Sequence, residues 1–584
     1  MKLIFRCMQK KDKIIAAIVM LFVIIQVVLE TKIPVIMGDI STMLQEGNMT
    51  MASVRSKGLQ MIAYALIAFA ASSIVCYLVI DVTCKLCKVL RTKVFSRILD
   101  YSLSEVSSFG TGTLISRCND DMEVVQGFMT QSLQPLIKAP ILLLLVFLRL
   151  SGTQTIWIVM SVAAILLLFV LVFYMFKSIV PFISESSIVN DRMIGSVREH
   201  IYGIREIHLG NRFSSQEEEY NKLNKLNAHY NFKVKSAMCL FSPGTSMLIY
   251  ALTVAIYVSG AFLIQNEEQV RQMADFSSMV SFVSYIAFIF TALINIVLVL
   301  LAIPSLLNSE NRISEVLNKK NSILDGEYNG QPSKRGTVEF EQVSFAYPGS
   351  DKYAIEDISF KINSGQTVAI IGGTGAGKTT VLNLMLRLYE AAEGEILVDG
   401  IPVRDYRLKD LRNIMGYVPQ QNYLFTGTIA GNIGYGENGR FQAALEEIQK
   451  AAVVGQADSF IREKQGGYHG EVHAGGTNFS GGQRQRLTIS RAICRDPEIY
   501  IFDDSFSALD FETDAKLRKA LKKTTKGATV IIVAQRISSV RDADQIIVMD
   551  NGRIIDQGTH EELLTRCGVY QEIASSQNPE EKAV

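Results

Sequence analysis

A phosphate-binding motif stands at Gly372–Thr379, where the sequence fits the pattern GxxxxGK[ST] at every position. An apolar run predicted as a strand (367–371) precedes it, and a predicted helix (381–388) follows it. Glycines let backbone N–H groups surround phosphate oxygens, Lys378 can reach the terminal phosphates and Thr379 can ligate Mg²⁺. The residues predicted to bind the nucleotide here are Gly372, Gly373, Thr374, Gly375, Ala376, Gly377, Lys378, Thr379 and Thr380.

A second element is acidic. The apolar run at 499–502 ends in Asp503 and Asp504. A strand ending in Asp places the carboxylate at the C-terminal edge of a sheet, where nucleotides bind in α/β folds. Asp503 is therefore the expected second Mg²⁺ ligand, beside Thr379.

A third element is a Ser-Gly-Gly-Gln run before a predicted helix, which is another anion-binding arrangement. One nucleotide does not need two such arrangements on one chain. The simplest explanation is a dimer, in which the run of each chain closes over the γ-phosphate of its partner. Its residues are Ser480, Gly481, Gly482 and Gln483.

The first half of the chain has a different character. The 584 residues are 48% hydrophobic and carry a formal net charge of +1, which gives no support for nucleic-acid binding. Long apolar runs crowd the first three hundred residues, and each is long enough to span a bilayer, which takes about 20 residues. The predicted spans are 14–37, 58–82, 133–151, 155–178, 237–264 and 276–306.

Lys and Arg are concentrated before the first span and after the second and fourth spans. These basic segments are expected to face the cytoplasm, and both termini with them. The two basic loops contain few Gly or Pro and predict long helical hairpins that project beyond the membrane.

Polar residues in the spans leave alternatives open. Asp81, Lys138 and Arg149 lie near span ends, where long side chains are expected to snorkel to the interface. Tyr250 and Asn295 could line a central cavity or make hydrogen bonds between helices.

From about Gly336 strand-like runs alternate with helical segments, which indicates an α/β domain. The predicted fold class is a six-helix α-helical transmembrane domain fused to an α/β phosphate-loop NTPase domain. The predicted boundaries are 1–310 for the membrane domain, 311–336 for a polar linker and 337–577 for the nucleotide-binding domain.

With these motifs in this order, the sequence resembles an ATP-binding-cassette (ABC) exporter half-transporter over nearly its whole length. The resemblance implies that ATP and Mg²⁺ bind the cassette, that Tyr347 stacks on adenine and that Gln420 contacts Mg²⁺. It identifies Ser480–Gln483 as the family's signature motif and places Asp510 in the D-loop.

Two departures from the family's pattern affect catalysis. Asp504 stands where the family carries a catalytic Glu, and Gln535 stands where it carries a switch His. The shorter carboxylate is expected to misplace the attacking water by about 1 Å, enough to cost on the order of 100-fold in rate. A third departure is the segment 470–476 before the signature motif. Asp504, Gln535 and Gln420 remain the predicted catalytic residues.

An intact signature motif beside a weakened catalytic pair predicts a heterodimer. The partner would be a second half-transporter with the consensus Glu and His, and the site of this chain would hydrolyse ATP slowly; a slow homodimer is the alternative. The resemblance predicts ATP-driven export of a small amphipathic compound, lipid or peptide across a bacterial plasma membrane. An importer with this fold, for example for a metal chelate, and an ATP-binding regulatory or sensing subunit remain as alternatives.

Overall fold

The computed structural model describes residues 10–45, 50–150, 154–265, 269–328, 335–436, 443–507 and 509–577. The chain divides into two compact units, which are taken separately below. The first comprises residues 1–98 and 112–319. The second comprises residues 99–111 and 320–584, so a short piece of the first half of the sequence belongs with the cassette.

Long helices build the first unit, and six of them are long and apolar enough to cross a membrane within the described residues. The number of spans predicted from hydropathy is thereby confirmed. Many large apolar side chains on these helices are exposed in the single chain, as lipid-facing surfaces require. The helices of this unit are α2 (Lys10–Gln45), α3 (Met51–Leu99), α5 (Thr111–Cys118), α6 (Asp120–Leu150), α7 (Thr155–Tyr202), α8 (Ile204–Leu209), α9 (Phe213–Gln265) and α10 (Gln269–Asn318).

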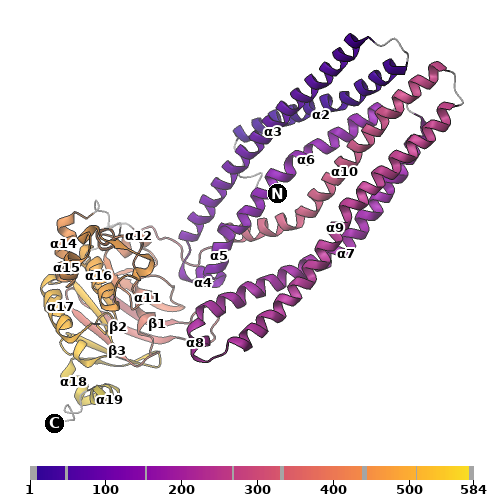
Figure 1. Ribbon diagram of the computed structural model, residues 1–584. Coiled ribbons are helices and arrows are strands. Elements are labelled where there is room, and N and C mark those ends of the chain that lie inside the picture. Colours follow the sequence, from indigo (N-terminus) through magenta and orange to yellow (C-terminus); the bar gives the residue numbers. More distant parts are fainter. Residues whose placement is uncertain are drawn as a thin grey trace. The chain divides into compact units, whose positions relative to one another are not determined.

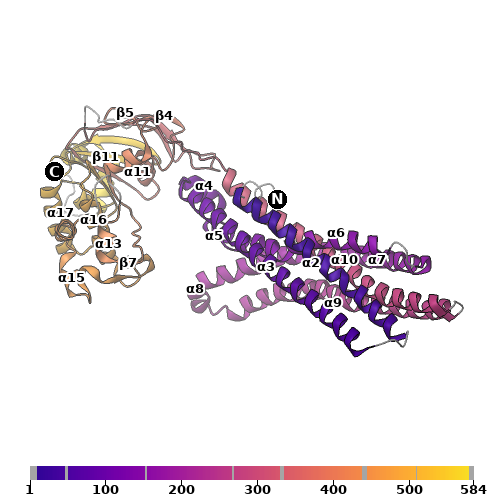
Figure 2. The ribbon, with the colours of Figure 1, turned by 90° about the horizontal axis from the view of Figure 1, so that it is seen from above.

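The helices run well past the apolar spans, as the long helical hairpins predicted from the basic loops require. Figures 1 and 2 show α7 and α9 side by side over much of their length, with α8 at their common end. Gly203 and Gly210 flank α8, and the N–H of each bonds back to a carbonyl of the preceding turn. Helix α10 also continues through Asn318, past the predicted start of the linker. The residues of α10 from about Asn311 onward are polar because they lie beyond the apolar span. The change in composition therefore comes before the end of the helix.

Pro34 lies inside α2 and interrupts its backbone hydrogen bonds. Helix α10 supplies hydroxyls at this point. Ser281 Oγ donates to the Pro34 carbonyl at 2.9 Å, and Tyr285 Oη donates to the Thr31 carbonyl at 3.0 Å. These bonds attach α10 to the proline-containing stretch of α2, although neither goes to the Glu30 carbonyl, the acceptor that Pro34 leaves without its helical donor.

The second unit contains a six-stranded sheet of order β12-β11-β3-β10-β9-β6, parallel except for the edge strand β12, and a four-stranded antiparallel sheet of order β2-β1-β4-β5. The strands predicted at 367–371 and 499–502 are present as β3 and β9. Six strands were not predicted: β2 and β12 mix apolar with charged residues, and β5, β6, β7 and β8 are short. The strands are β1 (Val338–Phe345), β2 (Ile355–Ile362), β3 (Thr367–Gly372), β4 (Glu393–Val398), β5 (Ile401–Pro402), β6 (Met415–Val418), β7 (Gly427–Thr428), β8 (Glu471–Val472), β9 (Ile499–Asp503), β10 (Thr529–Ala534), β11 (Gln545–Asp550) and β12 (Arg553–Gly558).

Helices cover this core and supply the segments between the strands. Apolar side chains from both sheets and from the helix after the phosphate loop form one buried cluster. The helices are α4 (Leu103–Phe109), α11 (Lys378–Met385), α12 (Leu408–Asn413), α13 (Ile429–Ile433), α14 (Leu445–Val454), α15 (Asp458–Glu463), α16 (Gly481–Cys494), α17 (Phe511–Thr524), α18 (His560–Arg566) and α19 (Gly568–Gln577).

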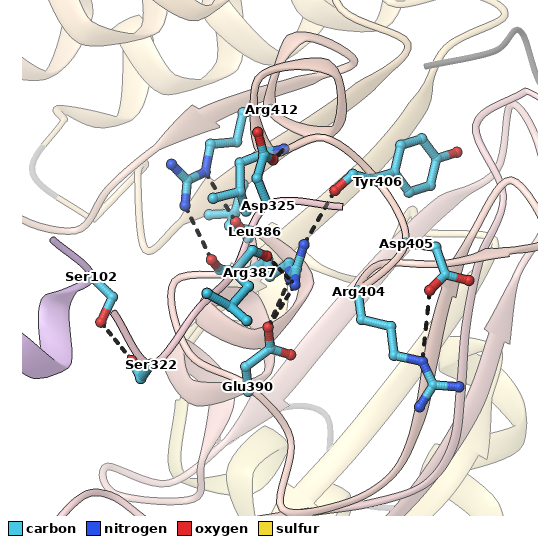
Figure 3. A network of polar contacts seen from close by, with 12 residues as sticks. Ser102, Ser322, Asp325, Leu386, Arg387, Glu390, Arg404, Asp405, Tyr406 and Arg412 are labelled. Atoms are coloured by element: carbon cyan, nitrogen blue, oxygen red, sulfur yellow. Dashed lines mark hydrogen bonds and ion pairs between the residues drawn. The ribbon is translucent and has the colours of Figure 1, made fainter. Parts of the chain in front are cut away.

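Residues 320–328 of the predicted linker belong to the cassette unit and are bonded to it (Figure 3), whereas residues 311–319 belong to the first unit. Arg387, just after α11, is 3% exposed. Its guanidinium donates to the Leu324 carbonyl at 2.7 Å and the Tyr406 carbonyl at 3.2 Å, and it pairs with Glu390 at 2.8 Å. Downstream, the Gly326 N–H donates to the same Tyr406 carbonyl at 3.0 Å. The linker is thus attached to the C-terminal end of the phosphate-loop helix.

Helix α4 is bonded to the same linker. Ser102 caps this helix, and Glu105 accepts from the Ser102 N–H at 3.0 Å and from the Ser322 N–H at 3.0 Å. Asn321 donates to the Asp100 carbonyl at 2.8 Å. The hydrogen bonds from Ser102 and Ser322 outweigh burial and hold the pKa of Glu105 below its ordinary value. These bonds explain why residues 99–111 group with the cassette.

Candidate nucleotide site

Strand β3, a glycine-rich turn and helix α11 form the phosphate loop. Gly377 sits at φ +95° immediately before α11, and a Cβ there would lie 2.6 Å from the Ile355 side chain. Only glycine fits this conformation in this space. The Lys378 ammonium is 8% exposed and donates to the carbonyls of Gly372 at 2.9 Å and Gly373 at 2.6 Å.

Burial shifts the pKa of Lys378. Desolvation lowers its pKa, and the carboxylates of Asp504 and Asp503 partly oppose that effect. Phosphate oxygens near the ammonium would favour its charged form. The hydrogen bonds to the loop carbonyls therefore keep the Lys378 ammonium at the position where a phosphate would bind.

Asp503, the last residue of β9, lies where the sequence predicted it. Its carboxylate accepts from Thr379 Oγ1 at 3.2 Å and from Tyr417 Oη at 3.3 Å, and it is 1% exposed. Burial raises its pKa, while the hydrogen bonds from Thr379 and Tyr417 oppose that rise. A carboxylate and a hydroxyl this close offer the oxygen ligands that Mg²⁺ prefers, so the donor set fits the cation.

The two departures from the family's pattern meet in space. Gln535 Nε2 donates to Asp504 Oδ2 at 3.3 Å. The Asp504 backbone has φ +46°, and its N–H bonds to the Val533 carbonyl at 2.9 Å, between β9 and β10. The carboxylate is therefore held beside an uncharged amide, which can donate or accept hydrogen bonds but cannot take up a proton near neutral pH.

These groups line one cavity of 510 Å³ on the cassette. Its size suits a nucleotide. Predicted residues that line it are Tyr347, Thr374, Gly375, Ala376, Gly377, Lys378, Thr379, Thr380, Gln420, Asp503, Asp504 and Gln535. Gly372 and Gly373 do not line the cavity; their carbonyls accept hydrogen bonds from the Lys378 ammonium.

Tyr347 stands at the cavity wall. Its hydroxyl lies 3.0 Å from Thr380 Oγ1, and its ring packs edge-on against Phe345 and Tyr389 at 5.0 and 5.3 Å. These contacts fix the ring beside the phosphate loop.

The signature motif and the D-loop residue do not line this cavity, although they belong to the same unit. Ser480 caps α16: its hydroxyl accepts from the Gln483 N–H at 3.2 Å, while Gln483 Oε1 accepts from the Ser480 N–H at 3.0 Å. Asp510 caps α17 by accepting from the Thr513 N–H at 2.9 Å, and that bond lowers its pKa. Both motifs are formed, but neither reaches the nucleotide cavity of its own chain.

The unusual segment before the signature motif is also ordered. Glu471 and Val472 form β8, which pairs with β7 at Gly427–Thr428. The Gly475 N–H bonds to the Leu424 carbonyl at 3.0 Å. The departure from the family's pattern thus joins the signature region to the segment that follows Gln420.

Sequence reasoning missed several residues of the site. Tyr417 lies three residues before Gln420, but its hydrogen bond to Asp503 depends on the pairing of β6 with β9, in which Tyr417 is opposite Ile501. Tyr353, Asn551 and Gly552 line the cavity from loops without a recognisable pattern. The adjoining strands β6 and β9 would have indicated Tyr417, had their pairing been known.

The fold and the site define a membrane protein with an attached nucleotide-binding cassette. The family model "ABC transporter transmembrane region" matches residues 16–302, and the model "ABC transporter" matches residues 355–507. Together with the relatives below, these matches show that the chain belongs to the ABC transporter family.

Relatives align along most of their length. An uncharacterized ABC transporter ATP-binding protein of Mycobacterium tuberculosis is 33% identical over 84% of this chain and 83% of its own. A probable multidrug resistance ABC transporter ATP-binding/permease protein of Bacillus subtilis is 32% identical over 83% and 82%. An ATP-dependent lipid A-core flippase of Haemophilus influenzae is 31% identical over 84% and 83%.

A solved structure shares the fold. A bacterial Atm1-family ABC exporter with ATP bound superimposes with a TM-score of 0.83 at 22% identity, covering 98% of this chain and 99% of that one. The chain therefore has the ABC exporter fold, and its cassette is an ABC ATPase, in which ATP hydrolysis is coupled to transport.

Proposed function

We propose that this chain is one half of a heterodimeric exporter that uses ATP to move amphipathic compounds out of the cytoplasm. One observation carries the proposal: a site with the Asp504–Gln535 pair coexists in one chain with a fully formed signature motif. A relative named as a flippase and another named as a probable multidrug resistance transporter support the substrate class.

ATP binds the cavity with its phosphates on the loop from Gly372 to Thr379 and its base on Tyr347. Thr379, Asp503 and Gln420 would hold Mg²⁺, which would neutralise phosphate charge. Lys378 exchanges its loop carbonyls for phosphate oxygens. Closure on a second cassette brings the partner's signature motif over this nucleotide.

Asp504 is the base that faces the attacking water in this site. Its side chain is one methylene shorter than Glu, which misplaces the attacking water. The carboxylate also accepts a hydrogen bond from Gln535. Gln535 can orient the γ-phosphate but cannot carry a proton for it. The site therefore retains ATP and hydrolyses it slowly, while the signature motif of this chain completes a competent site on the partner.

Transport follows from the exchange of ATP-bound and hydrolysed states. Cassette closure is passed to the membrane helices through the cytoplasmic hairpins, and hydrolysis on the partner resets the transporter. We place the protein in the plasma membrane with both termini in the cytoplasm, because the basic segments flank the predicted cytoplasmic ends of the spans.

The test begins with purification of the tagged chain from its native membrane. A co-purifying half-transporter that carries Glu and His at the positions of Asp504 and Gln535 is expected. The pair is then reconstituted in vesicles loaded with, or bathed in, fluorescent amphiphiles. Movement toward the side opposite the cassettes is expected with ATP.

Other outcomes would contradict the proposal. Recovery of this chain alone, as an active homodimer, would remove the heterodimer. Movement toward the cassettes would identify an importer. Strong ATP binding without movement of any amphiphile would identify a regulatory subunit.

A further inference from the structure

A charged pair joins two membrane-spanning helices. Lys138 Nζ on α6 lies 2.9 Å from Glu30 Oε1 and 2.8 Å from Glu30 Oε2 on α2. Gln26, one turn earlier on α2, donates from Nε2 to Glu30 Oε1 at 2.8 Å. The Lys138 ammonium thus binds a carboxylate on a neighbouring span, and the expectation that it snorkels to the interface stays a prediction.

The pair lies within the predicted spans. At about 1.5 Å per residue, Glu30 is roughly 24 Å along α2 from Ile14, where the predicted span begins, and about 10 Å from Met37, where it ends. Charged groups within membrane spans are costly, and those that occur mark functional sites. An ion pair replaced by apolar side chains of similar volume is often as stable, so packing alone does not explain its presence.

The group has unused hydrogen-bonding capacity. Gln26 is 4% exposed, and its Oε1 atom is buried without a hydrogen-bond partner. The side chains of Glu30 and Lys138 are 23% and 27% exposed, so a molecule outside the chain can reach them. A buried acceptor left without a donor costs about 1–3 kcal/mol, and a bound donor would remove that cost.

Neighbouring polar contacts have structural explanations that this group lacks. Ser281 and Tyr285 satisfy carbonyls around Pro34, and Lys32 lies over the ring of Tyr64 at 5.6 Å. In those cases each polar group bonds to a backbone carbonyl or lies over an aromatic face. In the Gln26–Glu30–Lys138 group the side chains bond to one another.

We propose that Gln26, Glu30 and Lys138 form a binding subsite for the headgroup of a zwitterionic amphiphile. The anionic part of the headgroup binds the Lys138 ammonium, and its cationic or N–H-bearing part binds Glu30 and the free carbonyl oxygen of Gln26. A ligand with a single charge would engage one member of the pair and strand the other in the membrane. A zwitterion replaces both partners at once.

This inference rests on the proposed function, since it specifies the class of exported amphiphile. The transporter, purified with the partner that accompanies it, is reconstituted in lipid nanodiscs. ATPase activity is measured with amphiphiles that share a decyl chain and carry a phosphocholine, a trimethylammonium, a sulfate or a maltoside headgroup. Wild-type protein is expected to respond at the lowest concentration to the phosphocholine compound.

Matched substitutions separate recognition from packing. Lys138→Met and Glu30→Gln each remove one charge, and Gln26→Leu removes the free acceptor. Lys32→Met is the control, since it removes another ammonium from α2, the helix that carries Gln26 and Glu30. Thermal unfolding of each variant, with and without phosphocholine amphiphile, reports stability and binding independently of ATP turnover.

The subsite predicts a shift in headgroup preference. Lys138→Met should raise the half-maximal concentration of the phosphocholine compound about tenfold, the loss expected for a hydrogen bond to a charged group, and should leave the maltoside response unchanged. Glu30→Gln should relatively favour the sulfate compound. Lys32→Met should match wild type.

Equal losses for all headgroups, or lower stability with unchanged preference, would overturn the subsite and leave a packing role. If no amphiphile stimulates the wild-type protein or stabilises it against unfolding, the proposed exporter function fails first. The two failures are therefore distinguishable.

Discussion

At the residue scale, Asp503 depends on the hydroxyls that surround it. Its carboxylate is almost wholly buried and keeps two donors, Thr379 and Tyr417. Thr379 belongs to the phosphate loop, whereas Tyr417 comes from the neighbouring strand β6. The tyrosine therefore stabilises the charge of a predicted metal ligand without being a ligand itself.

Tyr417→Phe should weaken binding of MgATP about fivefold, because a hydrogen bond of this kind is worth roughly 1 kcal/mol and its loss favours the protonated carboxyl. Displacement of a fluorescent ATP analogue measures the effect. Tyr389→Phe keeps the ring that packs against Tyr347 and is the control. Unchanged affinity in Tyr417→Phe would contradict this role.

Asp399 gives a pH dependence. It is 3% exposed, it accepts from the Thr337 N–H at 2.9 Å, and burial raises its pKa to about 6 despite that bond. A carboxyl whose pKa is raised on folding stabilises the fold below its unfolded pKa. That stabilisation is lost as the pH rises from the ordinary value of 3.8 through about 6.

Asp399→Asn should therefore raise the free energy of unfolding by roughly 2–3 kcal/mol at about pH 7.5, and the gain should vanish near pH 4. Denaturant unfolding of the full chain in detergent, followed at several pH values, measures it. The exposed Asp351→Asn is the control. A pH-independent difference would contradict the assignment to Asp399.

At the element scale, the linker is attached to the helix that follows the phosphate loop. Arg387 joins the Leu324 carbonyl to the end of α11, and Ser322 joins the same linker to α4 (Figure 3). A change in the position of α11 is therefore expected to reach the segment that follows α10. This path is covalent and hydrogen-bonded within the cassette unit.

Arg387→Met should destabilise the cassette by about 2–4 kcal/mol, because Glu390 and two carbonyls lose a buried donor. It should also lower the ratio of substrate-stimulated to basal ATPase activity. Arg404→Met, at a side chain that is 66% exposed, is the control. A stable variant with normal stimulation would show that the linker contact has no part in coupling.

The elements differ in how far sequence predicted them. The phosphate loop and the strands β3 and β9 were predictable because glycine spacing and apolar runs are local signals. The hydrogen bond between Gln535 and Asp504 was not, since it depends on the parallel pairing of β9 and β10. The membrane spans followed from hydropathy, but the Glu30–Lys138 pair depends on how α2 and α6 pack.

At the scale of the whole molecule, the predicted parts of the ATP site lie in separate places on the cassette unit of this chain. Its nucleotide cavity contains the phosphate loop, Asp503 and the Asp504–Gln535 pair, whereas the Ser480 motif lies outside it. Two chains are needed to bring these parts together. In the proposed heterodimer, the nucleotide cavity of this chain then contributes little to turnover, whereas its signature motif contributes much.

Steady-state ATPase activity of the reconstituted pair tests this asymmetry most directly, with Ser480→Arg and Asp504→Asn compared in this chain. Ser480→Arg should reduce turnover about 100-fold or more, the scale seen when a transition-state contact is removed, because it disables the competent site on the partner. Asp504→Asn should leave turnover within about twofold of wild type, because its site contributes little to hydrolysis. The reverse result, with Asp504→Asn inactive and Ser480→Arg active, would contradict the account.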